Sequence, residues 1–414
     1  MEFDLDDPKL LLRDDVLDDP RPLYDALRQR APVWRLPGEG TYLVSAPELI
    51  RDVVARPAEF SSNLVNLLCR GERGELVPFP VAPLGDPIHV LATADPPLHT
   101  RQRRLLQPHL NAAALARLEP LLRAIVDRQL DPLLAAGGGD VVPQLSDPLP
   151  ALAICHLVGL PPDDARRLLA VVAGVDPLLD GVTDLDGMAT AAGAALGLHQ
   201  YVQGHLDAAL ARSAPDRTGL LGVLADAVDA GGLDAGEALG ILVQLFSAGT
   251  QTTSSLIANA IEILARQPEL QQRLREDPER IPDALDDILR DDGPFQFHFR
   301  WTTTDATLGD WRIPADSRVL LMWAAANRPG AGESEGPHFA FGRGLHFCIG
   351  APLARLESRL ALARLLARSS RIALDPAHPP RRRRSIFLRR HASLPVALSA
   401  CAAGGPPARG PGQR

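Results

Sequence analysis

The feature that most constrains the fold of this 414-residue chain is a long stretch with helical periodicity. Between about residues 105 and 290, apolar residues recur at spacings of three and four, with breaks at Pro or Gly. Residues 33–45 and 295–321 are instead rich in aromatic and β-branched residues and contain turn residues. The sequence therefore predicts a mainly α protein with small β-sheets packed against a helical body.

No linker or internal repeat divides the chain, so we expect residues 1–400 to form a single domain. Residues 401–414, CAAGGPPARGPGQR, are rich in Gly and Pro, and we expect this tail to be disordered. The chain has no run of about eighteen uncharged apolar residues, and its first residues are acidic where a signal peptide is basic and then apolar. We therefore expect a cytoplasmic protein without a membrane segment.

Charge and cysteine content exclude further classes of protein. A net charge of −8 argues against general nucleic-acid binding, and the basic run at residues 381–384 is too short to reverse this. We expect that run to be a solvated loop. The four cysteines, which form no CxxC motif and predict reduced thiols rather than disulfides or a zinc site, are Cys69, Cys155, Cys348 and Cys401.

Cys348 lies in the segment FAFGRGLHFCIGAPLAR, residues 339–355. Gly342 and Gly344 permit the positive φ angles of a tight turn, and the residues after Gly350 are strong helix formers in an amphipathic pattern. Cys348 is therefore expected just before a helix N-terminus, where free backbone N–H groups stabilise a thiolate. Thiol chemistry alone leaves two alternatives open: a reactive or metal-ligating thiolate, or a buried structural cysteine.

The complete pattern, Phe341-Gly342-x-Gly-x-His346-x-Cys348-x-Gly350, resembles the haem-ligand loop of the cytochrome P450 monooxygenases. The resemblance extends over nearly the whole chain up to the tail, and it implies the cytochrome P450 fold with a single haem-binding domain. It also implies haem b (iron protoporphyrin IX) as the cofactor, with Cys348 as the axial ligand that pushes electron density onto the iron. Phe341, Gly342 and Gly350 then belong to the loop that passes close beneath the porphyrin.

Four basic residues match the family positions that hold the haem propionates. His99 and Arg103 lie four residues apart in DPPLHTRQRRLL, which places them on one face of a helix. Arg300 and His346 match two further propionate contacts. Each residue alone would be read as a solvated side chain, but together with the Cys348 loop they indicate a haem site.

The resemblance places the oxygen-side helix at ILVQLFSAGTQTTSSLIANAIEIL, where Ala248, Gly249, Gln251 and Thr252 match the family's Ala-Gly-x-acid-Thr motif. Gly249 would let the helix pass close to the haem face and open locally, at a cost of about 1 kcal/mol in helix propensity. Thr252 would control proton delivery, although threonines also pack in ordinary helices. Gln251 replaces the usual Asp or Glu, so it keeps hydrogen bonding but has no titratable proton.

A second departure from the family lies in DALDDILRDDGP, where Glu-x-x-Arg appears as Asp287-Ile-Leu-Arg290. In the family this pair is completed by an arginine from the segment before the cysteine loop. Residues 329–340 of this chain contain no arginine, and Arg328 belongs to an upstream turn. We therefore expect the third partner to be missing, and Asp286 is the less suitable partner by its spacing.

The resemblance implies an enzyme that binds O2 at haem iron, takes electrons from a ferredoxin-type partner and oxidises a small organic molecule in secondary metabolism. Hydroxylation, epoxidation and oxidative coupling or desaturation all stay open, because Gln251 alters the proton supply. Two alternatives are a non-catalytic P450-like partner or activator protein, and a haem-thiolate peroxygenase that uses peroxide directly. The retained Cys348 loop argues against the non-catalytic alternative.

Substrate and partner surfaces are predicted only as zones. Pocket walls are expected from residues 63–90, 174–198, 244–248 and 296–299, with His298 either facing the haem edge or simply packing. An acidic ferredoxin would fit a basic face formed by Arg101, Arg104, Arg343, Arg355 and Arg359.

Overall fold

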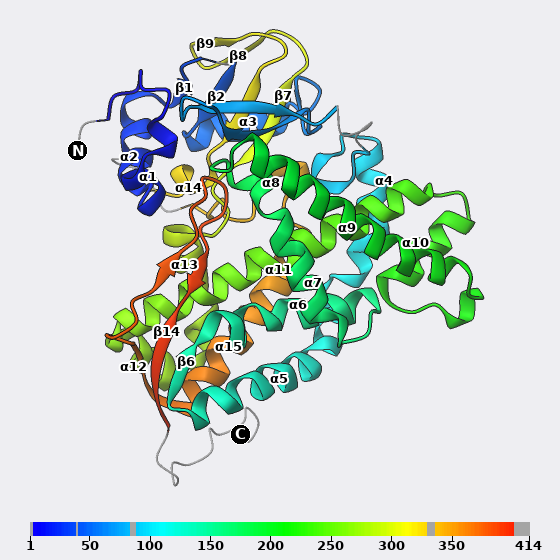
Figure 1. Ribbon diagram of the computed structural model, residues 1–414, viewed down its shortest axis with the longest axis vertical. Coiled ribbons are helices and arrows are strands. Elements are labelled where there is room, and N and C mark those ends of the chain that lie inside the picture. Colours follow the sequence, from blue (N-terminus) through cyan, green and yellow to red (C-terminus); the bar gives the residue numbers. More distant parts are fainter. Residues whose placement is uncertain (1–2, 39, 83–87, 329–335, 401–414) are drawn as a thin grey trace.

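The computed structural model describes residues 3–400 except for residues 39, 83–87 and 329–335 (Figure 1). The tail predicted for residues 401–414 therefore lies outside the described residues. The described chain is mainly helical with several small sheets, as the sequence predicted. None of its helices combines the length and the apolar character that crossing a membrane would need.

Most of the long α-helices of the described chain lie around α11 in Figure 1, whereas α1, α2 and α3 lie beside the large sheet at the top. The α-helices are α1 (Asp14–Asp18), α2 (Arg21–Arg30), α3 (Pro47–Ala55), α4 (Leu98–Leu106), α5 (Ala112–Ala135), α6 (Pro148–Val158), α7 (Asp164–Val175), α8 (Pro177–Asp180), α9 (Leu185–Leu210), α10 (Gly219–Asp229), α11 (Ala235–Arg266), α12 (Pro268–Glu276), α13 (Ile281–Asp292), α14 (Trp323–Ala326) and α15 (Ala351–Arg368).

The strands form small sheets at the edges of this helical body. They are β1 (Val33–Arg35), β2 (Thr41–Val44), β3 (Phe60–Ser61), β4 (Asn66–Arg70), β5 (Leu76–Pro80), β6 (Gly138–Asp140), β7 (His298–Thr302), β8 (Ala306–Leu308), β9 (Trp311–Ile313), β10 (Arg318–Leu321), β11 (Ser369–Leu374), β12 (Arg381–Arg382), β13 (His391–Ser393) and β14 (Pro395–Ala400). Four of them lie within residues 295–321 and two within residues 33–45, where the sequence predicted strands.

Helix α11 is the central axis of the helical body, and it crosses the middle of Figure 1. A capping box starts it: the Asp234 carboxylate accepts from the Glu237 N–H at 2.6 Å, and the Glu237 carboxylate accepts from the Asp234 N–H at 3.0 Å. The helix packs against α6, α9 and α15. Because other helices cover it on several sides, its sequence is apolar or small over most of its circumference.

The largest sheet has the strand order β1-β2-β10-β7-β3 and covers the upper end of the body in Figure 1. Strand β10 pairs parallel to β2 and antiparallel to β7. In this register Arg300 lies opposite Val319, and His298 lies opposite Leu321. Because side chains alternate along a strand, β7 presents His298 and Arg300 on the same face.

In the basic run at residues 381–384, Arg381, Arg383 and Arg384 are exposed, as the sequence predicted, whereas Arg382 is half-buried in strand β12. Arg382 begins a contact that reaches into the helical body: it binds Glu262 of α11 at 2.7 Å and Asp292 of α13 at 3.1 Å. Both carboxylates are nearly buried, so they need this cation. Arg382 turns inward because the buried carboxylates of Glu262 and Asp292 would be destabilised without a cation.

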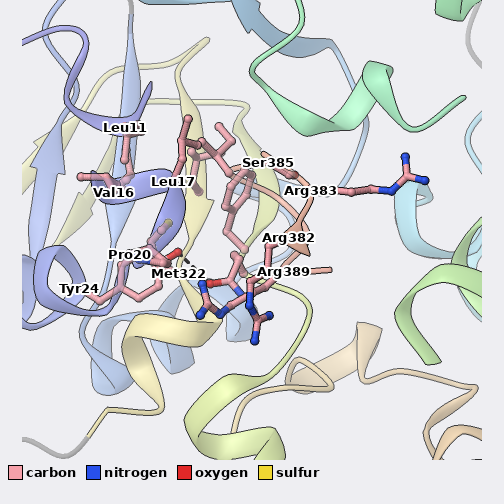
Figure 2. A pocket seen from close by; sticks show the side chains of 15 residues that line it. Leu11, Val16, Leu17, Pro20, Tyr24, Met322, Arg382, Arg383, Ser385 and Arg389 are labelled. Atoms are coloured by element: carbon pink, nitrogen blue, oxygen red, sulfur yellow. Dashed lines mark hydrogen bonds between the residues drawn. The ribbon is translucent and has the colours of Figure 1, made fainter. Parts of the chain in front are cut away.

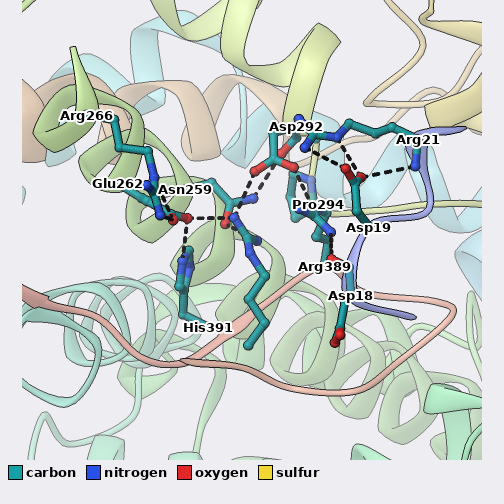
Figure 3. Close-up of polar contacts among 12 residues, drawn as sticks. Asp18, Asp19, Arg21, Asn259, Glu262, Arg266, Asp292, Pro294, Arg389 and His391 are labelled. Atoms are coloured by element: carbon teal, nitrogen blue, oxygen red, sulfur yellow. Dashed lines mark hydrogen bonds and ion pairs between the residues drawn. The ribbon is translucent and has the colours of Figure 1, made fainter. Parts of the chain in front are cut away.

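Neighbouring charges extend this contact, as Figure 3 shows. Glu262 also binds Arg266 at 2.8 Å and His391 at 2.8 Å, and Asp292 binds Arg389. The C-terminal segment is thus fastened to α11 and α13 by ion pairs rather than by apolar packing alone.

A small cavity of about 30 Å³ lies beside the same segment, where it meets α1, α2 and the large sheet (Figure 2). Tyr24 at its wall donates a hydrogen bond to Gln296 Oε1 at 2.9 Å. Of the residues that the sequence predicted for the functional site, only Gln296 and Phe297, from one of the expected pocket walls, line this cavity.

Replacing Arg382 should destabilise the fold much more than replacing its exposed neighbour. Arg382→Ala leaves Glu262 and Asp292 without their shared cation, and we expect the free energy of unfolding to fall by about 3 kcal/mol. Arg381→Ala should change it by less than about 0.5 kcal/mol. Urea unfolding followed by circular dichroism measures both, and equal effects would contradict the role assigned to the ion pairs.

Candidate functional site

A single cavity of about 250 Å³ brings together nearly all the residues that the sequence predicted for the site. It lies between α11 and the loop that precedes α15. Gln251 is not among the residues that line it. The predicted residues that do are Ala248, Gly249, Thr252, His99, Arg103, Arg300, Phe341, Gly342, His346, Cys348 and Gly350.

The loop around Cys348 has the backbone that the sequence predicted. Gly342 and Gly344 have φ angles of 71° and 70°, in the left-handed region that glycine adopts without strain. The Cys348 N–H donates to the Phe341 carbonyl oxygen at 2.9 Å, which closes the loop. Helix α15 begins at Ala351, so Cys348 stands just before its N-terminus and faces the cavity.

The surrounding protein acts on the Cys348 thiol in opposite directions. Desolvation raises its pKa above the ordinary value, and this effect outweighs the lowering by the N–H groups of Gly350 and Ala351 and by Arg103. The helix N-terminus therefore lowers the pKa, but by less than desolvation raises it. A metal ion deprotonates a thiol when it binds, so the site suits a metal ligand better than a free nucleophile.

His99, Arg103, Arg300 and His346 form what we call the donor cluster. Burial lowers the pKa of Arg300 to about 10 and also lowers that of Arg103. The Nδ1 atoms of His99 and His346 are buried without a hydrogen-bond partner, and the two rings lie 4.3 Å apart. Among the described residues no carboxylate pairs with either arginine of the cluster, so these desolvated donors lack an anion.

Haem fits this cavity on the chemistry of its lining. Propionate groups would supply the acceptors that the donor cluster lacks, and the apolar walls suit the macrocycle. Cys348 provides a sulfur ligand of the kind that binds haem iron. The residues that would hold the group are therefore the donor cluster together with Cys348, Phe341 and the loop glycines.

A short polar chain that the sequence did not reveal orients His346. Its Nε2 atom lies 2.9 Å from the Ser62 hydroxyl, and the Ser62 N–H donates to Asp95 at 2.8 Å. This arrangement occupies one ring nitrogen and leaves Nδ1 for an acceptor in the cavity. Ser62 and His346 are 284 residues apart, so no local pattern could have indicated the contact.

The α11 wall of the cavity carries Ala248, Gly249 and Thr252 as predicted. The Thr252 hydroxyl donates to the Ala248 carbonyl oxygen at 2.7 Å, one turn earlier. The helix stays regular through Gly249, so the predicted local opening does not occur in this structure. A Cβ atom at Gly249 would lie 2.6 Å from Cδ1 of Ile154, which shows that glycine also lets α11 and α6 approach.

Gln251 turns from the cavity toward the end of α7. Its side-chain amide donates to Asp176 and lies 3.4 Å from the Val172 carbonyl oxygen. Residues 174–198 were expected to form a pocket wall. Sequence reasoning therefore missed the contact that Asp176, within this range, makes with Gln251 of α11. No described residue of that zone or of residues 63–90 lines the cavity, whereas residues 244–248 and His298 do.

Asp286, rather than Asp287, is linked to the loop that contains Cys348, and the link runs through Arg355. Asp286 accepts a hydrogen bond from Arg355 at 2.9 Å and lies 3.3 Å from His338 Nε2. The Arg355 guanidinium in turn lies 4.5 Å above the ring centroid of Phe341, in the cysteine loop. Asp286 thus reaches the cysteine loop through Arg355 and Phe341.

Among the described residues neither Asp286 nor Asp287 forms an ion pair with Arg290, so the expectation about Asp286 stays a prediction; Asp286 binds Arg355 and His338 instead. Asp287 is exposed and forms no ion pair with a described residue. Arg290 donates to the Gly336 carbonyl oxygen at 2.9 Å. Most of the shortened segment, residues 329–335, lies outside the described residues.

Known proteins share this architecture. A family model described as "Cytochrome P450" matches residues 203–292. Cytochrome P450 144 of Mycobacterium tuberculosis is 36% identical over 363 residues, which cover 85% of this chain and 83% of that protein. The chain belongs to the cytochrome P450 family. It is thus a haem-dependent monooxygenase enzyme, and the non-catalytic alternative is set aside.

Two further relatives agree with this P450 assignment. The cytochrome P450 monooxygenase PikC of Streptomyces venezuelae is 33% identical over 383 residues, covering 88% of this chain and 87% of that protein. The structure of the P450 enzyme CxnD, described as acting in C–S bond formation in chuangxinmycin biosynthesis, matches with a TM-score of 0.80 at 27% identity. The match covers 92% of this chain and 95% of CxnD.

The donor cluster should stabilise the bound cofactor at the expense of the empty protein. Arg103→Leu removes a desolvated guanidinium without a protein partner, so we expect the haem-free P450 to become more stable by about 1 kcal/mol. Haem loss to an acceptor apoprotein should become about tenfold faster, because one charge-assisted hydrogen bond is gone. Thermal unfolding and the haem transfer rate measure the two effects.

Arg104→Leu is the matched control, because Arg104 is the exposed neighbour on the same helix. It should change neither quantity. A haem loss rate for Arg103→Leu equal to that of the unmodified protein would contradict the assignment of the donor cluster.

Proposed function

We propose that this P450 uses O2 and electrons from a ferredoxin-type donor to oxidise a small, largely apolar organic molecule, with haem b as its cofactor. The observation that carries the proposal is the cavity itself, where Cys348 and Thr252 share a space walled mainly by apolar side chains. Such a lining binds a ligand chiefly by burying apolar surface.

One polar group in the wall suggests how a substrate is oriented. Gln244 Oε1 accepts from the Ala92 N–H at 3.0 Å, which fixes the amide and directs its NH2 group away from that contact. A substrate with a carbonyl, ether or hydroxyl oxygen would accept from this group. His298 belongs with the cofactor contacts instead, because its Nδ1 atom lies 2.8 Å from Arg300 Nη1 and burial lowers its pKa to about 3.

Different residues of the chain would bind the cofactor, ligate its iron and hold a proton near it. Haem supplies the oxygen-activating chemistry when it is bound. The donor cluster holds its carboxylates, and Cys348 supplies the electron-rich ligand. Thr252 keeps a hydroxyl proton at the cavity wall, and apolar neighbours such as Leu245 limit the entry of bulk water.

The relatives support a role in tailoring secondary metabolites. PikC is a P450 monooxygenase, and CxnD acts in C–S bond formation during chuangxinmycin biosynthesis. We favour hydroxylation or epoxidation, because Thr252 keeps its place on the cavity wall. Oxidative coupling is the second candidate, favoured by the neutral Gln251 at the position of the family's acid.

Free thiols at Cys69 and Cys155 suit a reducing cytoplasm.

A basic face around the cysteine loop would receive the electron donor. Exposed Arg104 lies there, but several of its neighbours are already paired with acids of the same protein. These pairs are Arg101 with Glu237, Arg355 with Asp286, and Arg359 with Glu119. The paired arginines can still donate hydrogen bonds from the N–H groups that face away from their partners. The face would therefore attract an acidic ferredoxin mainly by raising the association rate, and each individual contact would contribute little to affinity.

The thiolate ligand should be visible in the spectrum of the carbon monoxide complex. Reduced protein with carbon monoxide should show the long-wavelength Soret maximum of thiolate ligation, and Cys348→Ala should abolish it. Cys69→Ala, which removes a thiol outside the cavity, should keep it. A spectrum typical of histidine ligation in the unmodified protein would contradict the proposed function.

Electron transfer from an acidic ferredoxin should slow as salt increases. Raising the ionic strength from about 0.01 to about 0.15 M shortens the Debye length from about 30 to about 8 Å and screens the basic face. Arg104→Glu should lower the low-salt rate severalfold, whereas Arg212→Glu, at an exposed site after α9, should not. Stopped-flow reduction of the P450 measures these rates. A rate independent of salt would exclude docking at this face.

A further inference from the structure

A short segment of the cavity wall has an unusual backbone. Leu91 and Ala92 both line the cavity, and Leu91 has a φ angle of 42°, in the left-handed region that glycine favours. A residue with a bulky side chain is rarely found there, because its Cβ atom crowds a carbonyl oxygen. Such conformations persist only where neighbouring contacts hold them, and they gather at functional sites. We call residues 90–93 the wall segment.

Two glutamines supply the contacts that hold the wall segment. Gln102 of α4 accepts a hydrogen bond from the Leu91 N–H at 2.8 Å. Gln244 of α11 accepts one from the next N–H, that of Ala92, at 3.0 Å. Two consecutive N–H groups are thus fixed by two different helices, and the peptide between Leu91 and Ala92 cannot rotate without breaking one of these bonds or both.

The Gln102 amide has only one suitable orientation. The residue is fully buried, and its Nε2 atom donates to Glu237 Oε1 at 3.1 Å. Turning the amide over would set its NH2 group against the Leu91 N–H and its oxygen against the carboxylate, and both contacts would be repulsive. Glu237 is itself held by the capping box of α11, where its other oxygen accepts from the Asp234 N–H. A continuous series of hydrogen bonds therefore runs from the start of α11 through Gln102 to Leu91.

The wall segment borders one end of the cavity. Gln244 and Thr252 both line the cavity from α11, and their separation in the sequence corresponds to about 12 Å along the helix axis. Because the wall segment is bonded to Gln244, it lies toward the N-terminal end of α11. A substrate whose reacting atom lies beside Thr252 would therefore meet the wall segment with a remote part of its skeleton.

We propose that Gln102 is a positioning residue for substrate selection, which holds Leu91 and Ala92 where they shape the remote end of the cavity. Gln102 does not line the cavity, so it acts through the Leu91 N–H. Without this acceptor the N–H would be buried and unpaired, and Leu91 would return to a negative φ angle. That change would move the Leu91 side chain relative to the cavity. The inference deepens the proposed function and rests on it.

Hydrogen exchange tests the hold on the wall segment directly. In the full-length haem-loaded enzyme, Gln102→Ala should speed amide exchange in a peptide covering residues 88–95 by at least about tenfold, as measured by mass spectrometry. Gln107→Ala is the matched control, because Gln107 is exposed just after α4, and it should leave the exchange unchanged. Equal exchange in Gln102→Ala and in the unmodified enzyme would overturn the inference.

Ligand binding to the ferric enzyme tests selection, and it needs neither O2 nor an electron donor. The probes are 1-methylimidazole and 1-hexylimidazole, because their ring nitrogen binds haem iron and the hexyl chain extends along the cavity. Gln102→Ala should weaken 1-hexylimidazole binding by about tenfold and 1-methylimidazole binding by less than about twofold, since only the longer probe reaches the wall segment. A spectral titration measures both dissociation constants. An equal loss for the two probes, or no loss for either, would contradict a role in selection.

A reciprocal exchange separates the hydrogen bonds of Gln102 from its volume. In Gln102→Glu with Glu237→Gln, the new carboxylate accepts from the Leu91 N–H and from the new amide, whose oxygen keeps the Asp234 N–H. This double variant should restore exchange and probe binding to within about twofold of the unmodified enzyme. Gln102→Glu alone, which sets two carboxylates against each other, should not.

The carbon monoxide spectrum distinguishes failure of this inference from failure of the proposed function. Each variant should keep the thiolate spectrum of the unmodified protein, because Gln102 and Glu237 do not line the cavity. Absence of that spectrum from the unmodified protein would contradict the proposed function. A double variant that keeps the spectrum but behaves like Gln102→Glu alone would overturn the inference about Gln102.

Discussion

The architecture of the site depends on nitrogen donors that the protein buries without giving them an anion. Arg103 and Arg300 are desolvated, and His99 and His346 each keep one buried ring nitrogen unpartnered. Such groups oppose folding unless an anion joins them. The surrounding ion pairs and the tight contact of α11 with α6 are therefore needed to hold open a cavity that the polypeptide on its own would not favour.

Local patterns were enough to predict the elements and the position of Cys348 just before a helix N-terminus. The turn glycines, the helix formers after Gly350 and the period of α11 each act within a few residues, so they can be read from the sequence. The position of Cys348 before α15 and the strands that hold Arg300 follow from such signals. Family resemblance added the donor cluster, which no periodicity alone would have joined.

Contacts between distant segments were not predictable in the same way. Asp286 rather than Asp287 binds Arg355 because the rotation of α13 against the cysteine loop decides which carboxylate faces that guanidinium, and spacing along the chain does not contain that rotation. Asp176 reached Gln251 for the same kind of reason. The arginines at residues 381–384 had the composition of a solvated loop, yet buried carboxylates on α11 and α13 draw Arg382 inward.

The ion pairs of the C-terminal segment have one more property in common: nearly all of their cations are guanidinium groups, and Lys9 is the only lysine in the chain. Guanidinium stays charged up to pH values above about 12. Moderately alkaline conditions therefore leave these pairs intact, whereas lysines would begin to lose their charge. On the acid side, hydrogen bonds with His391 and Arg266 hold the pKa of Glu262 well below its usual range in spite of its burial, so this carboxylate also keeps its charge as the pH falls.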